Sequence, residues 1–197
     1  MKAMVLKEFG KPLAWEEIPE PRPGLEDVLI ESRTNGLCAT DLTVIDGLLK
    51  TAKPPLLLGH ECAGIVKEVG PEVRELAPGD PVVLVTRKSC GKCDACRQGH
   101  EEWCSRSPGR FGMELDAGFG ELAVFPERNL VKIGPNVPID GASLIAGTMA
   151  SPLHGIKMAE VQVGETAVIF GMGGLGLHVL QILRYMGVDV IGVDVNR

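Results

Sequence analysis

Four cysteines stand within one short segment, in the order C-x2-C-x2-C-x7-C: Cys90, Cys93, Cys96 and Cys104. Tetrahedral Zn²⁺ takes four thiolate or imidazole donors, and closely spaced cysteines in a turn-rich loop supply them without straining the backbone. Gly91 and Gly99 allow tight turns, while Lys92 and Arg97 place positive charge near an anionic tetrathiolate. The spacing therefore predicts a structural zinc loop over residues 88–105, and it disfavours scattered thiols or a disulfide pair.

Composition excludes several classes of function. The formal net charge is −6 and the 20 Lys and Arg residues are spread thinly, so no basic patch for nucleic acid is visible. Lys7, Glu8 and Lys11 interrupt the N-terminus, which therefore has no signal-peptide core. The apolar stretch from Ala167 to Leu183 approaches the length of a membrane span, but its four glycines favour a strand that turns into a helix. We expect a cytoplasmic protein with no membrane contact.

The pattern of short apolar runs divides the chain. Residues 2–134 are expected to be mainly strand, with runs such as 28–30 and 82–85 between Pro and Gly residues. Helical spacing follows over 142–149 and 153–161, before a buried strand at 166–170. We expect one domain over 1–145 and the start of a second over 146–197.

A glycine fingerprint follows that strand, with the residues Gly171, Gly173, Gly174, Leu175 and Gly176. In a G-x-G-x-x-G turn the first glycine allows the turn, the second lets the backbone approach a pyrophosphate, and the third lets helix and strand pack closely. Asp194 lies in the next predicted strand, 188–195, where a carboxylate accepts hydrogen bonds from a ribose and repels a 2′-phosphate. The sequence therefore favours NAD over NADP, a preference that Arg197 would soften. The alternative is a glycine-rich turn with a surface Asp.

A third group of residues contains Cys38, Thr40 and Asp41, followed by His60 and Glu61. Taken alone, Cys38 is more often a small buried residue than a ligand, and His60 is ambiguous. Thiolate and imidazole from separate loops, beside two carboxylates, could instead hold a zinc with an open coordination position. An open position is typical of a catalytic zinc.

Taken together, these motifs resemble those of the zinc-dependent medium-chain alcohol dehydrogenases over essentially the whole chain. The resemblance also includes Gly64 and the run Gly118-Phe119-Gly120-Glu121. It implies a mixed α+β protein, with a GroES-like, mainly β catalytic domain followed by an incomplete Rossmann β-α-β unit. Cys38 and His60 would be catalytic zinc ligands, Glu61 a near or alternating ligand, Asp41 the carboxylate that orients His60, and Thr40 the group that passes the alcohol proton outward.

The implied activity is hydride transfer between an alcohol, or an aldehyde or ketone in reverse, and NAD. The implied metals are one structural and one catalytic zinc, and the implied partners are a small-molecule substrate and, in a full-length form, other copies of the chain. The alternative is a zinc-binding module or inactive fragment without turnover of its own.

Three departures from the family pattern affect this expectation. The segment 143–152 offers no Cys, Asp or Glu as a third ligand, so we expect Glu61 to ligate zinc directly, with an empty catalytic site as the competing hypothesis. Thr43 stands where many relatives have a histidine that completes a proton relay. The sequence also stops after the second strand of a fold that normally has six, so we expect a fragment that turns over poorly by itself.

Overall fold

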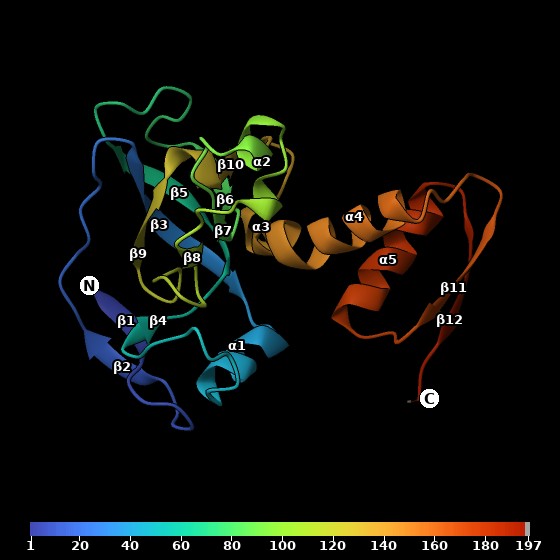
Figure 1. Cartoon of the computed structure of the whole chain (residues 1–197), viewed down its shortest axis with the longest axis horizontal. Helices are drawn as coiled ribbons and strands as arrows, with labels where there is room; N and C mark the ends of the chain where they lie inside the picture. The colour runs from blue at the N-terminus through green and yellow to red at the C-terminus, as the bar shows by residue number, and fades with distance from the viewer. Residues whose placement is uncertain (196–197) are drawn as a thin grey trace. The chain divides into compact units, whose positions relative to one another are not determined.

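The chain is organised as two compact units, Met1–Leu144 and Ile145–Arg197. The computed structural model describes residues 1–195. Figure 1 shows the first unit in blue to yellow and the second in orange to red.

A five-stranded antiparallel sheet forms the centre of the first unit, in the strand order β10-β6-β5-β3-β9. Its strands are β3 (Asp27–Gly36), β5 (Glu61–Val69), β6 (Pro81–Leu84), β9 (Leu122–Pro126) and β10 (Leu130–Lys132). Apolar side chains of these strands, among them Val28, Ile30 and Phe125, are fully buried and form the largest core. Helix α3 (Ile139–Leu144) packs against β3 and β5. The expected mainly β first part is therefore confirmed.

Smaller elements position the candidate site residues. The strands β1 (Lys2–Leu6), β2 (Ala14–Glu17) and β4 (Leu56–Leu57) form a second sheet in the order β2-β1-β4. The short strands β7 (Arg87–Lys88) and β8 (Gly109–Arg110) pair antiparallel and bracket the cysteine segment. That segment contains α2 (Asp94–Arg97) and a 3₁₀ turn, Glu101–Trp103, and a second 3₁₀ turn, Glu127–Asn129, joins β9 to β10.

Helix α1 (Ala39–Ile45) lies inside a region that the sequence pattern predicted as mainly strand. Its first turn is stabilised by Asp41, whose carboxylate accepts a hydrogen bond from the Cys38 amide at 2.9 Å. Val44 anchors the other end in a buried cluster with Leu6, Leu56 and Leu58. The helix was missed because local capping and long-range packing, rather than a helical repeat of apolar residues, determine it.

The second unit contains one parallel strand pair and its connecting helix. A π-helical turn (Ile145–Met149) and α4 (Ala150–Met158) come first, followed by β11 (Thr166–Phe170), α5 (Gly174–Tyr185) and β12 (Asp189–Val193). Strand β11 pairs in parallel with β12 (Figure 1), and the predicted β-turn-α-β unit is confirmed. Ile156, Leu183 and Val188 form its buried core.

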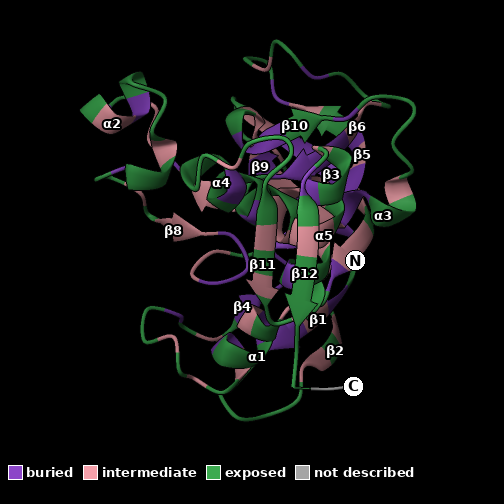
Figure 2. Cartoon of the chain, turned by 90° about the vertical axis from the view of Figure 1, so that its right-hand side faces the viewer, coloured by how far each residue is buried: buried purple, intermediate pink, exposed green. Residues whose placement is uncertain are grey.

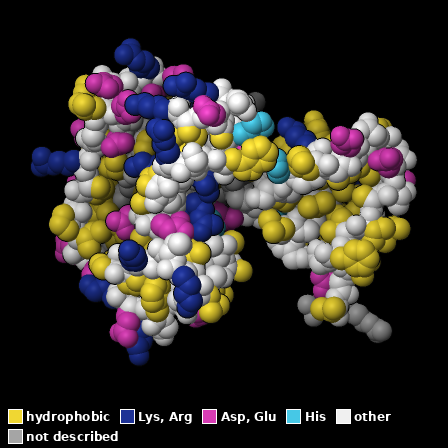
Figure 3. Space-filling view, viewed as in Figure 1, with side chains coloured by type: hydrophobic (Ala, Val, Ile, Leu, Met, Phe, Trp, Pro, Cys, Tyr) yellow, Lys and Arg dark blue, Asp and Glu magenta, His cyan; other side chains and the backbone are white. Residues whose placement is uncertain are grey.

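One side of this strand pair presents apolar side chains to solvent. Val168 is 52% exposed, Phe170 81% and Ile191 53%. Figure 2 shows β11 and β12 mostly as exposed or intermediate, and Figure 3 shows hydrophobic side chains on the surface of this unit. The expected exposure of an incomplete sheet is therefore visible.

The stretch 167–183 is divided between β11, a glycine turn and α5. Across residues 1–195, no helix combines the length and the apolar character that crossing a membrane requires.

Candidate metal centres and cofactor-binding loop

The four cysteines of the predicted zinc loop converge. One Sγ atom from each lies within 4.8 Å of the others, and Cys93, Cys96 and Cys104 are buried. The sulfur atoms of Cys93 and Cys96 lie 3.4 Å apart, those of Cys93 and Cys104 3.9 Å, and those of Cys90 and Cys96 4.0 Å. Four sulfurs around a tetrahedral zinc at 2.3 Å would lie about 3.8 Å apart. The donor set and its spacing therefore fit a four-thiolate zinc.

Backbone amides prepare some of these sulfurs for metal binding. Hydrogen bonds from the amides of Cys96 and Ser105 lower the pKa of Cys93 to about 6. The Lys92 amide, at 3.5 Å from the sulfur, lowers the pKa of Cys90. Burial raises the pKa of Cys96 to about 12, an effect that a bound cation would oppose by stabilising the thiolate.

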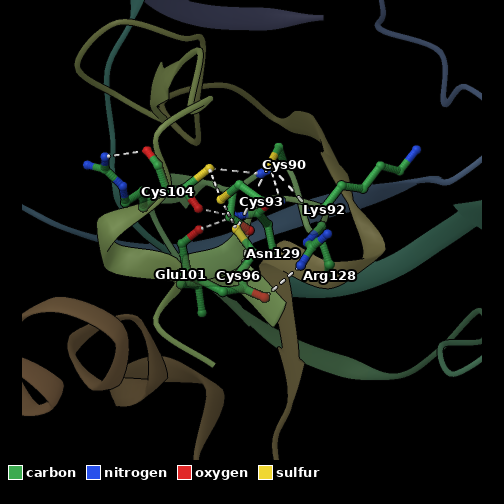
Figure 4. A network of polar contacts seen from close by, with 11 residues as sticks. Cys90, Lys92, Cys93, Cys96, Glu101, Cys104, Arg128 and Asn129 are labelled. Atoms are coloured by element: carbon green, nitrogen blue, oxygen red, sulfur yellow. Dashed lines mark hydrogen bonds and ion pairs between the residues drawn. The ribbon is translucent and has the colours of Figure 1, made fainter. Parts of the chain in front are cut away.

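A polar network outside the cysteines holds the loop in place (Figure 4). Arg128 forms an ion pair with Glu101 at 2.6 Å, and the Ser89 hydroxyl donates a hydrogen bond to the same carboxylate. The buried Asn129 amide donates to the carbonyls of Val85 and Arg87 at 2.8 and 2.7 Å. Sequence reasoning missed these residues because nothing in their local pattern shows that segments near 89, 101 and 128 meet.

A second group of donors contains Cys38, His60 and Glu61. Their ligand atoms lie within 4.8 Å of one another. Cys38 precedes α1, while His60 and Glu61 stand at the start of β5 and are 5% and 3% exposed. Three donors of these types fit a zinc that retains one open coordination position.

Asp41 links two members of this three-donor group. One carboxylate oxygen accepts from the Cys38 amide at 2.9 Å, and the other lies 3.2 Å from Nδ1 of His60. A carboxylate on Nδ1 fixes the imidazole ring and leaves Nε2 as the nitrogen free for a metal. The structure therefore brings Asp41 to the place that the resemblance implied.

The same contacts change the acidity of both donors. Burial would raise the pKa of the Cys38 thiol, but hydrogen bonds with Thr40 and His60 outweigh it and lower this pKa. Burial would likewise lower the pKa of His60, but Asp41 and Cys38 outweigh it and raise this pKa. The thiol thus loses its proton more readily than an ordinary cysteine, which favours metal binding.

Two glycines make room for this group. A Cβ at Gly36 would meet the carboxylate of Glu61 and would lie 3.0 Å from its Cβ. Gly112 has φ +73°, and a Cβ there would lie 2.8 Å from the His60 amide nitrogen. The segments around Gly36 and Gly112 therefore pack directly against the start of β5.

The two threonines near this group differ in their surroundings. The Thr40 hydroxyl lies 3.6 Å from the Cys38 sulfur. The exposed Thr43 hydroxyl donates to the Ala39 carbonyl at 3.1 Å, inside its own helix. Thr40 is therefore beside the three-donor group, whereas the hydroxyl of Thr43 is engaged by the α1 backbone.

The glycine fingerprint forms the turn between β11 and α5 in the second unit. Gly171 has φ +92°, and a Cβ at Gly176 would collide with the Gly171 carbonyl. Gly174 and Leu175 begin α5, whose first N–H groups have no partner within the helix. The Asp194 carboxylate accepts a hydrogen bond from the Met172 amide at 2.6 Å, so it lies beside the turn. Leu175 is 57% exposed, and Arg197 lies outside the described residues.

The first unit matches a known domain. The family model for the alcohol dehydrogenase GroES-like domain covers residues 24–135, which is more than half of the chain. The chain therefore belongs to the zinc-dependent medium-chain alcohol dehydrogenase family, a family of enzymes.

Individual relatives extend this match to both units. An acryloyl-coenzyme A reductase from Metallosphaera sedula is 35% identical over 100% of this chain. The cobalt- and zinc-bound alcohol dehydrogenase from Pyrobaculum aerophilum is 29% identical, with a TM-score of 0.93 over 100% of this chain and 60% of that one. A Sinorhizobium meliloti 1021 protein solved with bound NADP is 31% identical, with a TM-score of 0.89 over 97% of this chain and 55% of that one. The chain spans 59% of the Metallosphaera reductase.

Proposed function

We propose that this chain is the metal-binding part, and the first segment of the dinucleotide-binding part, of a zinc-dependent oxidoreductase. The reaction is hydride transfer between an alcohol, or the matching aldehyde or ketone, and NAD. One observation carries the proposal: the ligand atoms of Cys38, His60 and Glu61 lie within 4.8 Å of one another, and three protein ligands leave one coordination position of zinc open. A closed four-cysteine group and a glycine turn in the same chain support it.

The roles of the residues follow from their contacts. Zinc, when bound by Cys38, His60 and Glu61, supplies a Lewis acid that makes a substrate hydroxyl more acidic. Asp41 contacts both the Cys38 backbone amide and the His60 ring. It thereby fixes the positions from which the Cys38 sulfur and the His60 Nε2 would bind the same zinc. Thr40 lies beside the Cys38 sulfur, where its hydroxyl would relay the substrate proton by accepting it and passing its own proton to water. Because the Thr43 hydroxyl is engaged by Ala39, the proton then leaves through water.

The choice of NAD rests on Asp194. Its carboxylate lies beside the glycine turn, where it accepts from the Met172 amide and repels a second phosphate on the ribose. Asp194→Asn should therefore narrow the preference for NADH over NADPH, measured by the quenching of intrinsic fluorescence during titration. Asp189→Asn, at the exposed start of β12, is the matched control and should change neither affinity.

Zinc content and cobalt spectroscopy test the main proposal. The purified chain should hold about two zinc ions by elemental mass spectrometry, one lost in Cys93→Ser and the other in Cys38→Ser. After substitution by Co²⁺, imidazole should shift the visible bands of the open site and leave those of the four-thiolate site unchanged. One zinc, lost only in Cys93→Ser, would instead favour a zinc-binding module without turnover.

A second candidate reaction is reduction of a carbon–carbon double bond in an acyl thioester. The Metallosphaera relative named as an acryloyl-coenzyme A reductase favours it. Assays of the natural protein that contains this sequence, with acryloyl-coenzyme A and with a panel of alcohols, separate the two. Oxidation of NADH or NADPH by the thioester, without alcohol turnover, would replace the first candidate by the second.

A further inference from the structure

A pocket of about 590 Å³ opens in the first unit, and its lining contains none of the metal-donor residues. It is formed by the segment after α1, by the β7-β8 pair and by the start of the segment that follows β8. Its polar lining consists mainly of Thr51, Lys53, Arg87, Ser107, Arg110 and Glu114. Neither metal centre uses any of these side chains as a ligand.

The pocket has more positive than negative charge. Arg110 donates to Glu114 through Nε at 3.2 Å and through a terminal nitrogen at 2.8 Å, which neutralises this arginine. Glu114 also accepts from the Thr51 hydroxyl at 2.7 Å. Within the part of the chain that the structure describes, Lys53 has no ion pair. One lysine and one arginine, Lys53 and Arg87, therefore remain without a carboxylate in this pocket.

Arg87 is the more informative of these two cations. It stands directly opposite Arg110 in the β7-β8 pair, but unlike Arg110 it has no carboxylate partner among the described residues. A terminal nitrogen of Arg87 reaches the Cys104 carbonyl at 3.4 Å, but its buried Nε has no hydrogen-bond partner among the described residues. A buried N–H without an acceptor lowers stability unless something else satisfies it.

The geometry points to an oxyanion site: Arg87 and Lys53 bind a phosphate or carboxylate group of a small-molecule ligand in this pocket. An oxyanion in this pocket can accept hydrogen bonds from the terminal nitrogens of Arg87, and the planar guanidinium suits two-point binding of either group. Lys53 adds a second positive charge from a different chain segment.

The pocket adjoins the three-donor group through one short segment. Arg110 and Glu114 form part of its wall, and Gly112 between them packs against the His60 backbone. We infer that a ligand whose anionic group occupies this pocket could extend past this segment towards the start of β5. This last step rests on the proposed function and makes the substrate an anionic compound, whereas oxyanion binding itself requires neither zinc nor hydride transfer.

Titration calorimetry of the zinc-loaded chain, with inorganic pyrophosphate and with citrate as probes, tests the site. Arg87→Gln should weaken the binding of whichever probe binds by about 10-fold or more, since a charged hydrogen bond is lost. Lys53→Gln should weaken it by about 3-fold. The control is Lys50→Gln, which should bind the probe as the unchanged chain does. The exposed ammonium of Lys50 donates to the Gly47 carbonyl at 3.1 Å, and Lys50 does not line the pocket.

The two probes and the variants give separate answers. Binding of pyrophosphate alone would assign the pocket to a phosphate group, and binding of citrate alone to a carboxylate. No binding of either probe at about 10 mM, or equal weakening by Lys50→Gln, would overturn the site. Lys53 is exposed and unpaired, so Lys53→Gln remains a fair test if Arg87→Gln does not fold.

Two further readouts separate this site from the metal centres. Cys38→Ser should lose one zinc and bind the probe with unchanged affinity. The oxyanion site can therefore be correct even if the proposed hydride transfer is wrong. Arg87→Gln should keep its zinc content. Loss of zinc with unchanged probe binding would mean that Arg87 serves the nearby thiolates, and the proposal would then be wrong.

Discussion

The two metal-donor groups of the first unit differ in how they are built. The four-cysteine group comes from one segment, residues 90–104, and its donors depend on the local backbone for their hydrogen bonds. The group of Cys38, His60 and Glu61 joins the start of α1 to the start of β5, and it needs Asp41 to hold both parts. The first group is a closed set of four thiols, whereas the second has three donors of three different types.

The number of protein ligands indicates a different role for each zinc. A full set of four ligands leaves no position for a substrate, so its metal contributes to folding. Three ligands leave a position open, and the surrounding contacts then have to keep the donors in place without a fourth protein ligand. Single substitutions test whether zinc binding by each group depends on these ligands and contacts.

Cys93→Ser should have the largest effect. Removing one thiolate from the closed set should release its zinc and lower the melting temperature by about 10 °C or more, because metal binding there contributes directly to folding. Elemental mass spectrometry and a thermal melt measure both changes. Cys62→Ser is the matched control, since Cys62 is buried beside Glu61 and belongs to neither group. Retention of two zinc ions by Cys93→Ser would refute the closed site.

Glu61→Gln should act only on the three-donor group. If Glu61 is a ligand, the neutral amide should release that zinc and leave the four-cysteine zinc, as measured by zinc content and by cobalt spectra. Glu68 is an exposed residue on the same strand, so Glu68→Gln serves as the control. A Glu61→Gln chain with two tightly held zinc ions would show that Glu61 is not needed as a ligand.

Asp41→Asn should have an intermediate effect on the same group. The substitution weakens the contact with Nδ1 of His60, so we expect the zinc affinity of the three-donor group to fall by about 10- to 100-fold. Competition with a chromophoric chelator measures this affinity. The four-cysteine group should be unchanged, and Asp46→Asn, at the other end of α1, should change neither group. An unaltered zinc affinity in Asp41→Asn would show that Asp41 does not position the zinc ligands.

Glu114→Gln should have the smallest effect and should act on the segment that follows β8. Burial would raise the pKa of Glu114, but Arg110 and Thr51 outweigh it and lower it from 4.5 to about 2. Its stabilising effect is therefore complete above about pH 5 and is lost as the pH falls towards 2. We expect the variant to lose about 1 to 2 kcal/mol of unfolding free energy at pH 7, a modest value because Arg110 is 38% exposed.

Urea unfolding at pH 7 and pH 3 measures this difference. The gap between Glu114→Gln and the unchanged chain should shrink at the lower pH, where the effect of the carboxylate is partly lost. Glu72→Gln, an exposed residue, should show no gap at either pH. A constant gap would mean that Glu114 contributes through packing and not through its charge.

Local signals in the sequence predicted much of this fold and its site. The strand at 166–170 was placed with both ends correct, because an apolar run there is bounded by polar residues and glycine. The prediction that this strand is buried was wrong, since each of its residues is exposed or only partly buried in the structure. The four cysteines were sufficient to predict a cluster, since their spacing leaves little freedom. Pairing of Asp41 with His60 followed from the resemblance, and the structure brings them within 3.2 Å.

Interactions over long sequence distances were not predictable in the same way. Arg128 reaches Glu101, and Arg87 faces Arg110, only because segments separated in sequence become neighbours in the fold. Helix α1 was missed because its start depends on one carboxylate and its packing on Leu6 and Leu58. Such features depend on topology, which periodicity in a single segment does not contain.

The close approach of Gly36 to Glu61 has a consequence for how this protein can evolve. The Glu61 carboxylate occupies the space that any larger residue at position 36 would need. Substitution of the glycine is therefore compatible with the fold only after residue 61 has become shorter or has turned away. The order of mutations is thus constrained. Positions 36 and 61, which are paired across β3 and β5, should change together in any lineage that loses this carboxylate.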